Sequence, residues 1–172
     1  FANLDAVLVQ LEIPLETVEA VFDLAHRTGV LSILDAGPAR PLSPDILRKA
    51  DIVSPNESEV EAITGVAVTT LDDAKRAAAR LREMGAREVV LKLGANGAYY
   101  LGDESFHVPP YPIEPVDTTA AGDAFTAALG FAWKSLPRQQ AIQFANATGA
   151  LAATVAGAQP SMPTFAAVRD FL

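Results

Sequence analysis

Val30-Leu31-Ser32-Ile33-Leu34-Asp35 and Asp51-Ile52-Val53-Ser54 are two short, mostly apolar runs, and the stretch between them, Pro44–Lys49, has the pattern of a helix. Continuous apolar runs of this length are typical of parallel strands that are covered on both faces. A strand, a helix and a second strand in this order form one unit of an α/β fold. The sequence therefore predicts a sheet that is mostly parallel.

The same alternation of strands and helices continues in both directions along the chain. Two more strands are expected at Ala6–Leu11 and Glu88–Leu93, and Ala98–Leu101 with Ser105–Val108 indicates an antiparallel hairpin at the sheet edge. The other helices are expected at Leu15–Thr28, Glu57–Thr64, Leu71–Met84, Gly122–Lys134, Pro137–Val155 and Pro163–Leu172. Since no linker is long enough to separate two domains, we expect residues 1–172 to form a single three-layer α-β-α domain.

Composition excludes several classes of protein. The chain has 172 residues, 50% of them hydrophobic, and a net charge of −8, so a sizeable core is expected and a nucleic-acid partner is not. No apolar run reaches the roughly 18 residues that span a bilayer, which predicts a cytoplasmic protein without a membrane partner. The sequence has no cysteine and only two histidines, so a Cys nucleophile or a His-based metal cluster is not expected.

The run Asp117-Thr118-Thr119-Ala120-Ala121-Gly122-Asp123 lies at an expected junction between a loop and a helix. The first N–H groups of a helix have no acceptor within it, and the helix dipole is positive there, so such a junction binds anions. Ala120, Ala121 and Gly122 leave these donors uncovered. Asp123 would repel a bound phosphate but could take a proton from an attacking hydroxyl, which indicates phosphoryl transfer to an alcohol. The alternative is that Asp and Gly are ordinary capping residues.

This run resembles the D-T-x-(A/G)-(A/G)-G-D signature of the ribokinase family of sugar kinases, and it matches at every position. The resemblance implies an anion hole at Ala120–Gly122, Asp123 as the catalytic base, and ATP-dependent phosphorylation of the terminal hydroxyl of a sugar, with D-ribose to D-ribose 5-phosphate as the expected reaction. Another sugar or nucleoside kinase of the family, such as a fructokinase or adenosine kinase, and a non-catalytic nucleotide-binding form are the alternatives. The chain has no Walker A run, which excludes a P-loop kinase.

Asn56 and Glu59 follow an expected strand and resemble the family's N-x-x-E motif, which lies near the magnesium and the phosphates. At a spacing of three residues on a helix, the amide and the carboxylate share one face. Because Mg²⁺ keeps several of its waters, an indirect role for Glu59 is chemically reasonable. The alternative is a plain helix start in which the same two residues form a capping box.

The nucleotide is expected to contact two further segments. The run Lys92-Leu93-Gly94-Ala95-Asn96-Gly97 resembles the family's nucleotide loop, with Lys92 in place of the hydroxyl residue of the closest ribokinases, although a turn between two strands also fits it. Asn146 aligns with a position that lines the adenine pocket. Tight packing is the alternative there, since the helix around Asn146 is rich in Ala and Gly.

A monovalent cation is also implied by the resemblance. Gly157-Ala158-Gln159-Pro160-Ser161 looks like the ribokinase segment that encloses K⁺ together with the start of the anion-hole loop. An ion of this kind is held by several carbonyl and side-chain oxygens. The matching positions are Asp117, Thr119, Ala152, Val155, Gly157 and Ser161. A proline turn that closes a helix is the alternative.

The sugar-binding part of the family is poorly represented. Glu12, at the expected end of the first strand, corresponds to an acidic residue that hydrogen-bonds the sugar, although a water-facing charge fits equally well. The resemblance covers nearly all of this chain but only the C-terminal, nucleotide-binding and catalytic part of the family, so the lid through which the family forms homodimers is expected to be absent. The chain opens at Phe1 as though truncated, which leaves its activity alone, and its dimerisation, open.

Overall fold

The computed structural model describes residues 1 and 3–172, which divide into two compact units. The first unit contains residues 1–93 and 99–107, and the second contains residues 94–98 and 108–172. The first unit holds nearly all of the sheet, whereas the second is mostly helical. Each unit has its own packing.

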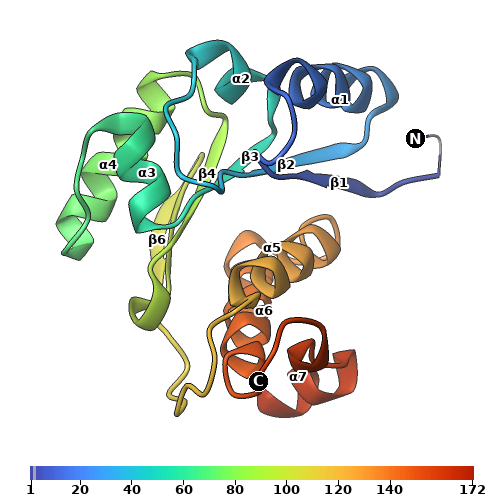
Figure 1. Ribbon diagram of the computed structural model, residues 1–172, viewed down its shortest axis with the longest axis vertical. Helices are drawn as coiled ribbons and strands as arrows, with labels where there is room; N and C mark the ends of the chain where they lie inside the picture. The colour runs from blue at the N-terminus through green and yellow to red at the C-terminus, as the bar shows by residue number, and fades with distance from the viewer. Residues whose placement is uncertain (2) are drawn as a thin grey trace. The chain divides into compact units, whose positions relative to one another are not determined.

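The sheet of the first unit has six strands that follow one another in chain order (Figure 1). The strands are β1 (Ala6–Val9), β2 (Leu31–Asp35), β3 (Ile52–Ser54), β4 (Glu88–Lys92), β5 (Ala98–Leu101) and β6 (Ser105–Val108). β1 to β4 are parallel, and their register places Leu34 beside Val53 and Val53 beside Val89. β5 and β6 are the hairpin expected at the sheet edge.

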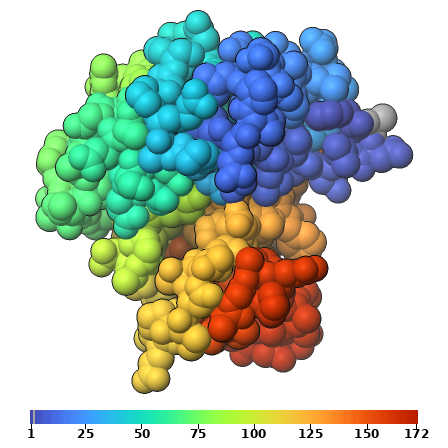
Figure 2. Space-filling model, viewed as in Figure 1, coloured from blue at the N-terminus to red at the C-terminus, as the bar shows by residue number. Residues whose placement is uncertain are grey.

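Four helices of the first unit pack on one face of this sheet (Figure 1). They are α1 (Leu15–Thr28), α2 (Pro44–Lys49), α3 (Glu57–Thr64) and α4 (Leu71–Glu83). Because side chains alternate between the two faces of a strand, one set of strand residues enters the core that these helices cover. That core includes Phe22, Leu34, Leu47, Val53, Val60, Leu81, Val89 and Leu91. In the space-filling view the side chains of these helices form a continuous surface over the first unit (Figure 2).

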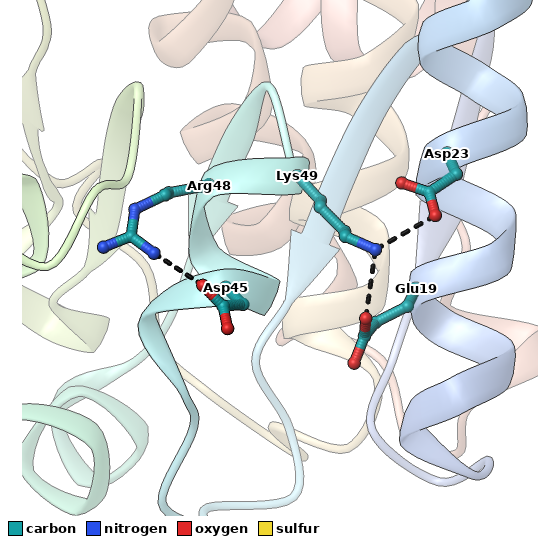
Figure 3. A network of polar contacts seen from close by, with 5 residues as sticks. All are labelled: Glu19, Asp23, Asp45, Arg48 and Lys49. Atoms are coloured by element: carbon teal, nitrogen blue, oxygen red, sulfur yellow. Dashed lines mark hydrogen bonds and ion pairs between the residues drawn. The ribbon is translucent and has the colours of Figure 1, made fainter.

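A polar contact joins α1 to α2 at the surface. The Lys49 ammonium lies 3.0 Å from a carboxylate oxygen of Glu19 and 3.0 Å from one of Asp23 (Figure 3). Beside it, Arg48 pairs with Asp45 of its own helix. Exposed ion pairs of this kind contribute little to stability, so the apolar core, and not this network, holds the two helices on the sheet.

The second unit is formed by α5 (Ala121–Ala132), α6 (Arg138–Ala152) and α7 (Phe165–Phe171). α5 and α6 approach closely because small residues line their contact. A Cβ added at Gly149 would lie 3.1 Å from the carbonyl oxygen of Ala121. Aromatic rings from all three helices, Phe131, Phe144 and Phe165, meet with centroids about 6 Å apart.

The ends of several elements differ from those expected. β1 ends at Val9 and not at Leu11, because the Leu11 N–H donates to the carbonyl of Gly37 at 2.7 Å instead of extending the ladder. α6 ends at Ala152, since Thr154 and Val155 donate to carbonyls three residues back, which tightens the last turn. The expected strands at residues 30–35, 51–54 and 88–93 are each shorter by one residue. The ends of the expected helices at residues 71–84, 122–134, 137–155 and 163–172 also shift by one to three residues.

The turn at Gly94–Asn96 is followed by Gly97, and any other residue at this position would be strained. Gly97 has a φ of +83°, and a Cβ added there would lie 2.1 Å from the carbonyl oxygen of Val108. Both the left-handed backbone and the close approach of a second chain segment require the missing side chain. Gly97 therefore fixes how the start of β5 meets the end of β6.

We expect Gly97→Ala to destabilise the protein more than Gly157→Ala. Gly157 has a similar φ of +88° in the same unit, but the nearest atom to an added Cβ is 3.6 Å away. Both substitutions carry the left-handed strain of about 1–2 kcal/mol, and only Gly97→Ala adds a clash with backbone. Chemical denaturation followed by circular dichroism measures both losses. Equal losses would show that the close contact at Gly97 relaxes without cost.

Candidate functional site

The loop before α5 enters the helix through a strained residue. Ala120, the N-cap of α5, has a φ of +62° and is the non-glycine residue with positive φ among those described. The Ala121 N–H donates to the Thr118 carbonyl at 3.1 Å, so one amide of the predicted anion hole is already used. Helix geometry provides no intrahelical acceptor for the Gly122 N–H, and no side chain caps α5. Strain of this kind is typical of ligand-binding loops.

Asp123 lies in the first turn of α5, on the exposed side of the helix. A carboxylate in this position is favoured by the positive end of the helix dipole. The predicted catalytic acid and the predicted anion hole are therefore next to each other at one helix end, in the second unit.

Asp117 joins the start of this loop to the segment after α6. Its two carboxylate oxygens accept hydrogen bonds from the Thr119 N–H at 2.9 Å and the Gly157 N–H at 2.8 Å. Hydrogen bonds from the Thr119 side chain and from the Gly157 and Thr119 N–H groups lower the pKa of Asp117 to about 2. The N–H groups of Val116 and Asp117 both donate to the Ala153 carbonyl. The loop is thus tied to the end of α6 by side chain and backbone together.

The other residues predicted to hold a monovalent cation lie in the same unit. The buried Ser161 hydroxyl donates to the Ala158 carbonyl at 2.7 Å, and the Ala152 carbonyl accepts from the Val155 N–H at 3.3 Å. Thr119 and Val155 are exposed. This set of one carboxylate with neutral oxygens suits a weakly hydrated ion, because each oxygen keeps a lone pair beyond the bond that it accepts.

Asn146 is buried in α6 and contacts backbone. Its Nδ2 atom donates long hydrogen bonds to the carbonyls of Val108 at 3.4 Å and Pro109 at 3.3 Å. These contacts hold the segment that leaves β6. A contact of Asn146 with adenine stays a prediction.

In the first unit, Asn56 and Glu59 form the capping box of α3. The Glu59 N–H donates to Asn56 Oδ1 at 2.9 Å, and the Asn56 N–H donates to Glu59 Oε2 at 2.7 Å. Burial raises the pKa of Glu59, while the charge of Lys92 opposes that rise. A Cβ added at Gly37 would lie 2.8 Å from Glu59 Oε1, so Gly37 leaves room at this carboxylate.

Each Glu59 oxygen accepts one hydrogen bond from Asn56 and keeps acceptor capacity beyond it. Because Mg²⁺ keeps several of its waters, these oxygens fit a hydrated ion reached through its waters. Among residues 1 and 3–172, no three acidic, His or Cys side chains come together as a metal site.

Lys92 forms an ion pair that sequence reasoning did not find. Its ammonium lies 2.6 Å from Asp35 Oδ1, and both side chains are largely buried. Asp35 stands at the end of an apolar strand, 57 residues before Lys92 in the chain. A lone carboxylate at the carboxyl end of a parallel strand is the signal that could have marked it, since ligands bind at that edge.

Glu12 and the loop after β4 contain the remaining predicted site residues. Glu12 is exposed in a turn beyond β1 and not at the end of a strand, because β1 ends three residues earlier. Leu93 packs into the core of the first unit, so its side chain is not available to a ligand, whereas Gly94, Ala95 and Asn96 are exposed.

The low pKa of Asp117 predicts an acid-dependent contribution to stability. A pKa lowered from 3.8 to about 2 means that Asp117 stabilises the fold above about pH 4 and loses this effect as the pH falls towards 2. The difference in melting temperature between the parent protein and Asp117→Asn should therefore shrink over this range. The exposed Asp103→Asn is the control and should follow the parent. A constant difference between pH 6 and pH 2 would contradict the assignment.

The chain is similar to known carbohydrate kinases over nearly its whole length. The sequence pattern of the pfkB family of carbohydrate kinases matches residues 1–165 of this chain. The ribokinase of Haemophilus influenzae is 37% identical over 175 residues, which cover 99% of this chain and 56% of the relative. The deoxyribokinase of Salmonella typhi is 32% identical over 169 residues, which cover 96% of this chain and 55% of the relative. The chain therefore spans about half the length of the curated relatives that it matches.

The structure of Arabidopsis thaliana ribokinase complexed with ribose and ATP superimposes with a TM-score of 0.93 at 34% identity, covering 99% of this chain and 56% of that one. Ribokinase from Thermotoga maritima gives a TM-score of 0.85 at 34% identity, covering 97% of this chain and 56% of that one. These likenesses confirm the predicted three-layer α/β class with its mostly parallel sheet and antiparallel edge strands. Taken with the match over residues 1–165, they mean that the chain belongs to the pfkB family of carbohydrate kinases.

Proposed function

We propose that this protein transfers the γ-phosphoryl group of ATP to the terminal hydroxyl of a sugar, and that D-ribose is the acceptor. The observation that carries this proposal is the strained entry into α5, where Ala120 precedes Gly122 and Asp123. Relatives at 35–37% identity that are named ribokinase support ribose as the acceptor. The structure of the Arabidopsis relative contains ribose and ATP.

The start of α5 is the proposed anion hole. The Gly122 N–H and the positive end of a helix of 12 residues favour the negative charge that spreads over the transferred group. Gly122 has no side chain to cover its amide. The loop keeps its shape because Asp117 holds it to the segment after α6, so the donors need not reorganise when the phosphate arrives.

Asp123 is the proposed general base. It would accept the proton of the sugar hydroxyl as the oxygen attacks phosphorus, and the leaving group is ADP. Its exposed position in the first turn of α5 leaves it accessible to an acceptor. A carboxylate next to an anion hole has no use in binding phosphate alone, and this supports chemistry at the site over simple nucleotide binding.

Asn56, Glu59 and Lys92 are the proposed contacts of the metal-nucleotide. Mg²⁺ would neutralise charge on the phosphates, and Asn56 and Glu59 would orient its waters from the start of α3. Lys92 would donate to phosphate oxygens. The backbone of Leu93, Gly94, Ala95, Asn96 and Gly97, together with Asn146, is the proposed contact of the nucleoside part. Glu12 is kept as a proposed contact of the sugar.

A monovalent cation such as K⁺ is the proposed occupant of the oxygens around Asp117. The set consists of Asp117, Thr119, Ala152, Val155, Gly157 and Ser161. The ion would add positive charge to the same loop connection that Asp117 already stabilises, without contact to the sugar. We therefore propose that it acts on the shape of the anion hole.

Asp123→Asn tests the base directly. The expected result is a fall in turnover of about 10²-fold to 10⁴-fold, the usual range for loss of a general base, with nucleotide affinity nearly unchanged. Turnover is measured as ADP release with D-ribose, Mg²⁺ and K⁺, and affinity by calorimetric titration with ATP. Asp103→Asn, a change of the same kind at an exposed loop, should behave like the parent.

Equal turnover in Asp123→Asn and the parent would refute the base assignment. Nucleotide binding without any ADP release from the parent, with D-ribose or with 2-deoxyribose, would favour a non-catalytic nucleotide-binding form instead.

A further inference from the structure

We propose that Asp35 is a positioning residue that holds the Lys92 ammonium in place for the phosphates of the nucleotide. This inference rests on the proposed function. It adds a carboxylate that takes no part in the reaction itself and that acts through the lysine beside it.

The sheet register brings the two residues to the same face. Asp35 on β2 is the parallel partner of Ser54 on β3, and Lys92 leaves β4 on the face opposite to Val89 and Leu91. The Lys92 N–H donates to the Pro55 carbonyl at 2.8 Å, which fixes where the side chain starts. From there it reaches across β3, and its ammonium lies 2.6 Å from Asp35 Oδ1. Both ends of the side chain are thus held.

The ion pair of Asp35 with Lys92 is buried, so each charge depends on the other. The Lys92 and Asp35 side chains are only 12% and 7% exposed, so either charge alone would lie in a poorly solvated position. Lysine is flexible and loses several rotamers when one contact fixes it, and the buried carboxylate removes that freedom before a ligand binds. An ammonium has three N–H donors, and the bond to Asp35 uses one. The other two remain for an anion.

The surroundings of the pair are polar beyond what a structural ion pair needs. The Ser54 hydroxyl, fully buried and adjacent to Asp35 in the register, has no hydrogen-bond partner. Glu59 lies close enough for the charges of both Asp35 and Lys92 to act on it. A pair that served only to hold the fold would be as stable with apolar residues in its place. An unpaired hydroxyl and a second carboxylate beside it indicate a place that receives a polar ligand.

The test is calorimetric titration of the chain with MgATP in the presence of K⁺. Lys92→Met is expected to weaken binding about tenfold or more, the factor that one charge-assisted hydrogen bond provides. Asp35→Asn should weaken binding to a similar degree, and the double variant should bind no more weakly than Lys92→Met alone. Asp23→Asn is the matched control, because it removes the carboxylate of another lysine pair, with Lys49, at the helical surface.

Thermal unfolding separates positioning from a purely structural role. Asp35→Asn leaves a buried lysine without its partner and should lower the melting temperature, whereas the double variant should recover part of the loss. Exchanging the two residues, Asp35→Lys with Lys92→Asp, gives a second measurement if Asp35→Asn does not fold. The exchange should restore stability without restoring affinity, since the ammonium then lies on the wrong strand.

Four outcomes would overturn the inference. They are parent-like affinity in Asp35→Asn, additive losses in the double variant, recovery of both stability and affinity in the exchange, and unchanged affinity in Lys92→Met. Absence of MgATP binding by the parent would refute the proposed function, and this inference with it. The other four leave the proposed reaction standing, although unchanged affinity in Lys92→Met would remove Lys92 from the proposed nucleotide contacts.

Discussion

The alternation of side chains along parallel strands is the constraint on which the first unit depends. Leu34, Val53 and Val89 lie side by side and enter the core under the four helices. The same register turns Asp35 and Lys92 to the opposite face, where their charges meet. A shift of one residue in any of these strands would exchange apolar and charged side chains between the faces. The packing that stabilises the sheet therefore also determines where its polar residues lie.

In the second unit, the close contact of two helices has a comparable effect. α5 and α6 approach through small residues such as Gly149, and this sets where the loop before α5 must begin. Asp117 then joins that loop to Gly157 beyond the end of α6. Ala120 keeps its left-handed backbone between these fixed points, because bonds on both sides of it leave little room to relax. The strain is located at the proposed anion hole.

Local signals allowed much of the fold to be predicted from the sequence. Helices α1, α2 and α3 have the bounds expected from the sequence, and α1 and α3 end at Gly29 and Gly65, because helix ends depend on residues within one turn. The capping box of Asn56 was among the alternatives for the same reason. The pair of Asp35 and Lys92 was not predicted, because it depends on the register of three strands and spans 57 residues. The bond from Gly157 to Asp117 likewise joins distant segments and was not predicted; the resemblance to a family had only placed both residues around a cation.

Asp35 and Asp117 illustrate one use of a carboxylate that differs from the use proposed for Asp123. Each accepts hydrogen bonds from donors that would otherwise be mobile or poorly solvated, an ammonium in one unit and two backbone amides in the other. A buried lysine without Asp35 would be an uncompensated charge and would destabilise the structure around it. The Asp35 carboxylate compensates the charge of Lys92 and also fixes the direction in which its ammonium points. The ion pair of Asp35 with Lys92 therefore compensates a buried charge and also orders the ammonium that we propose contacts the nucleotide.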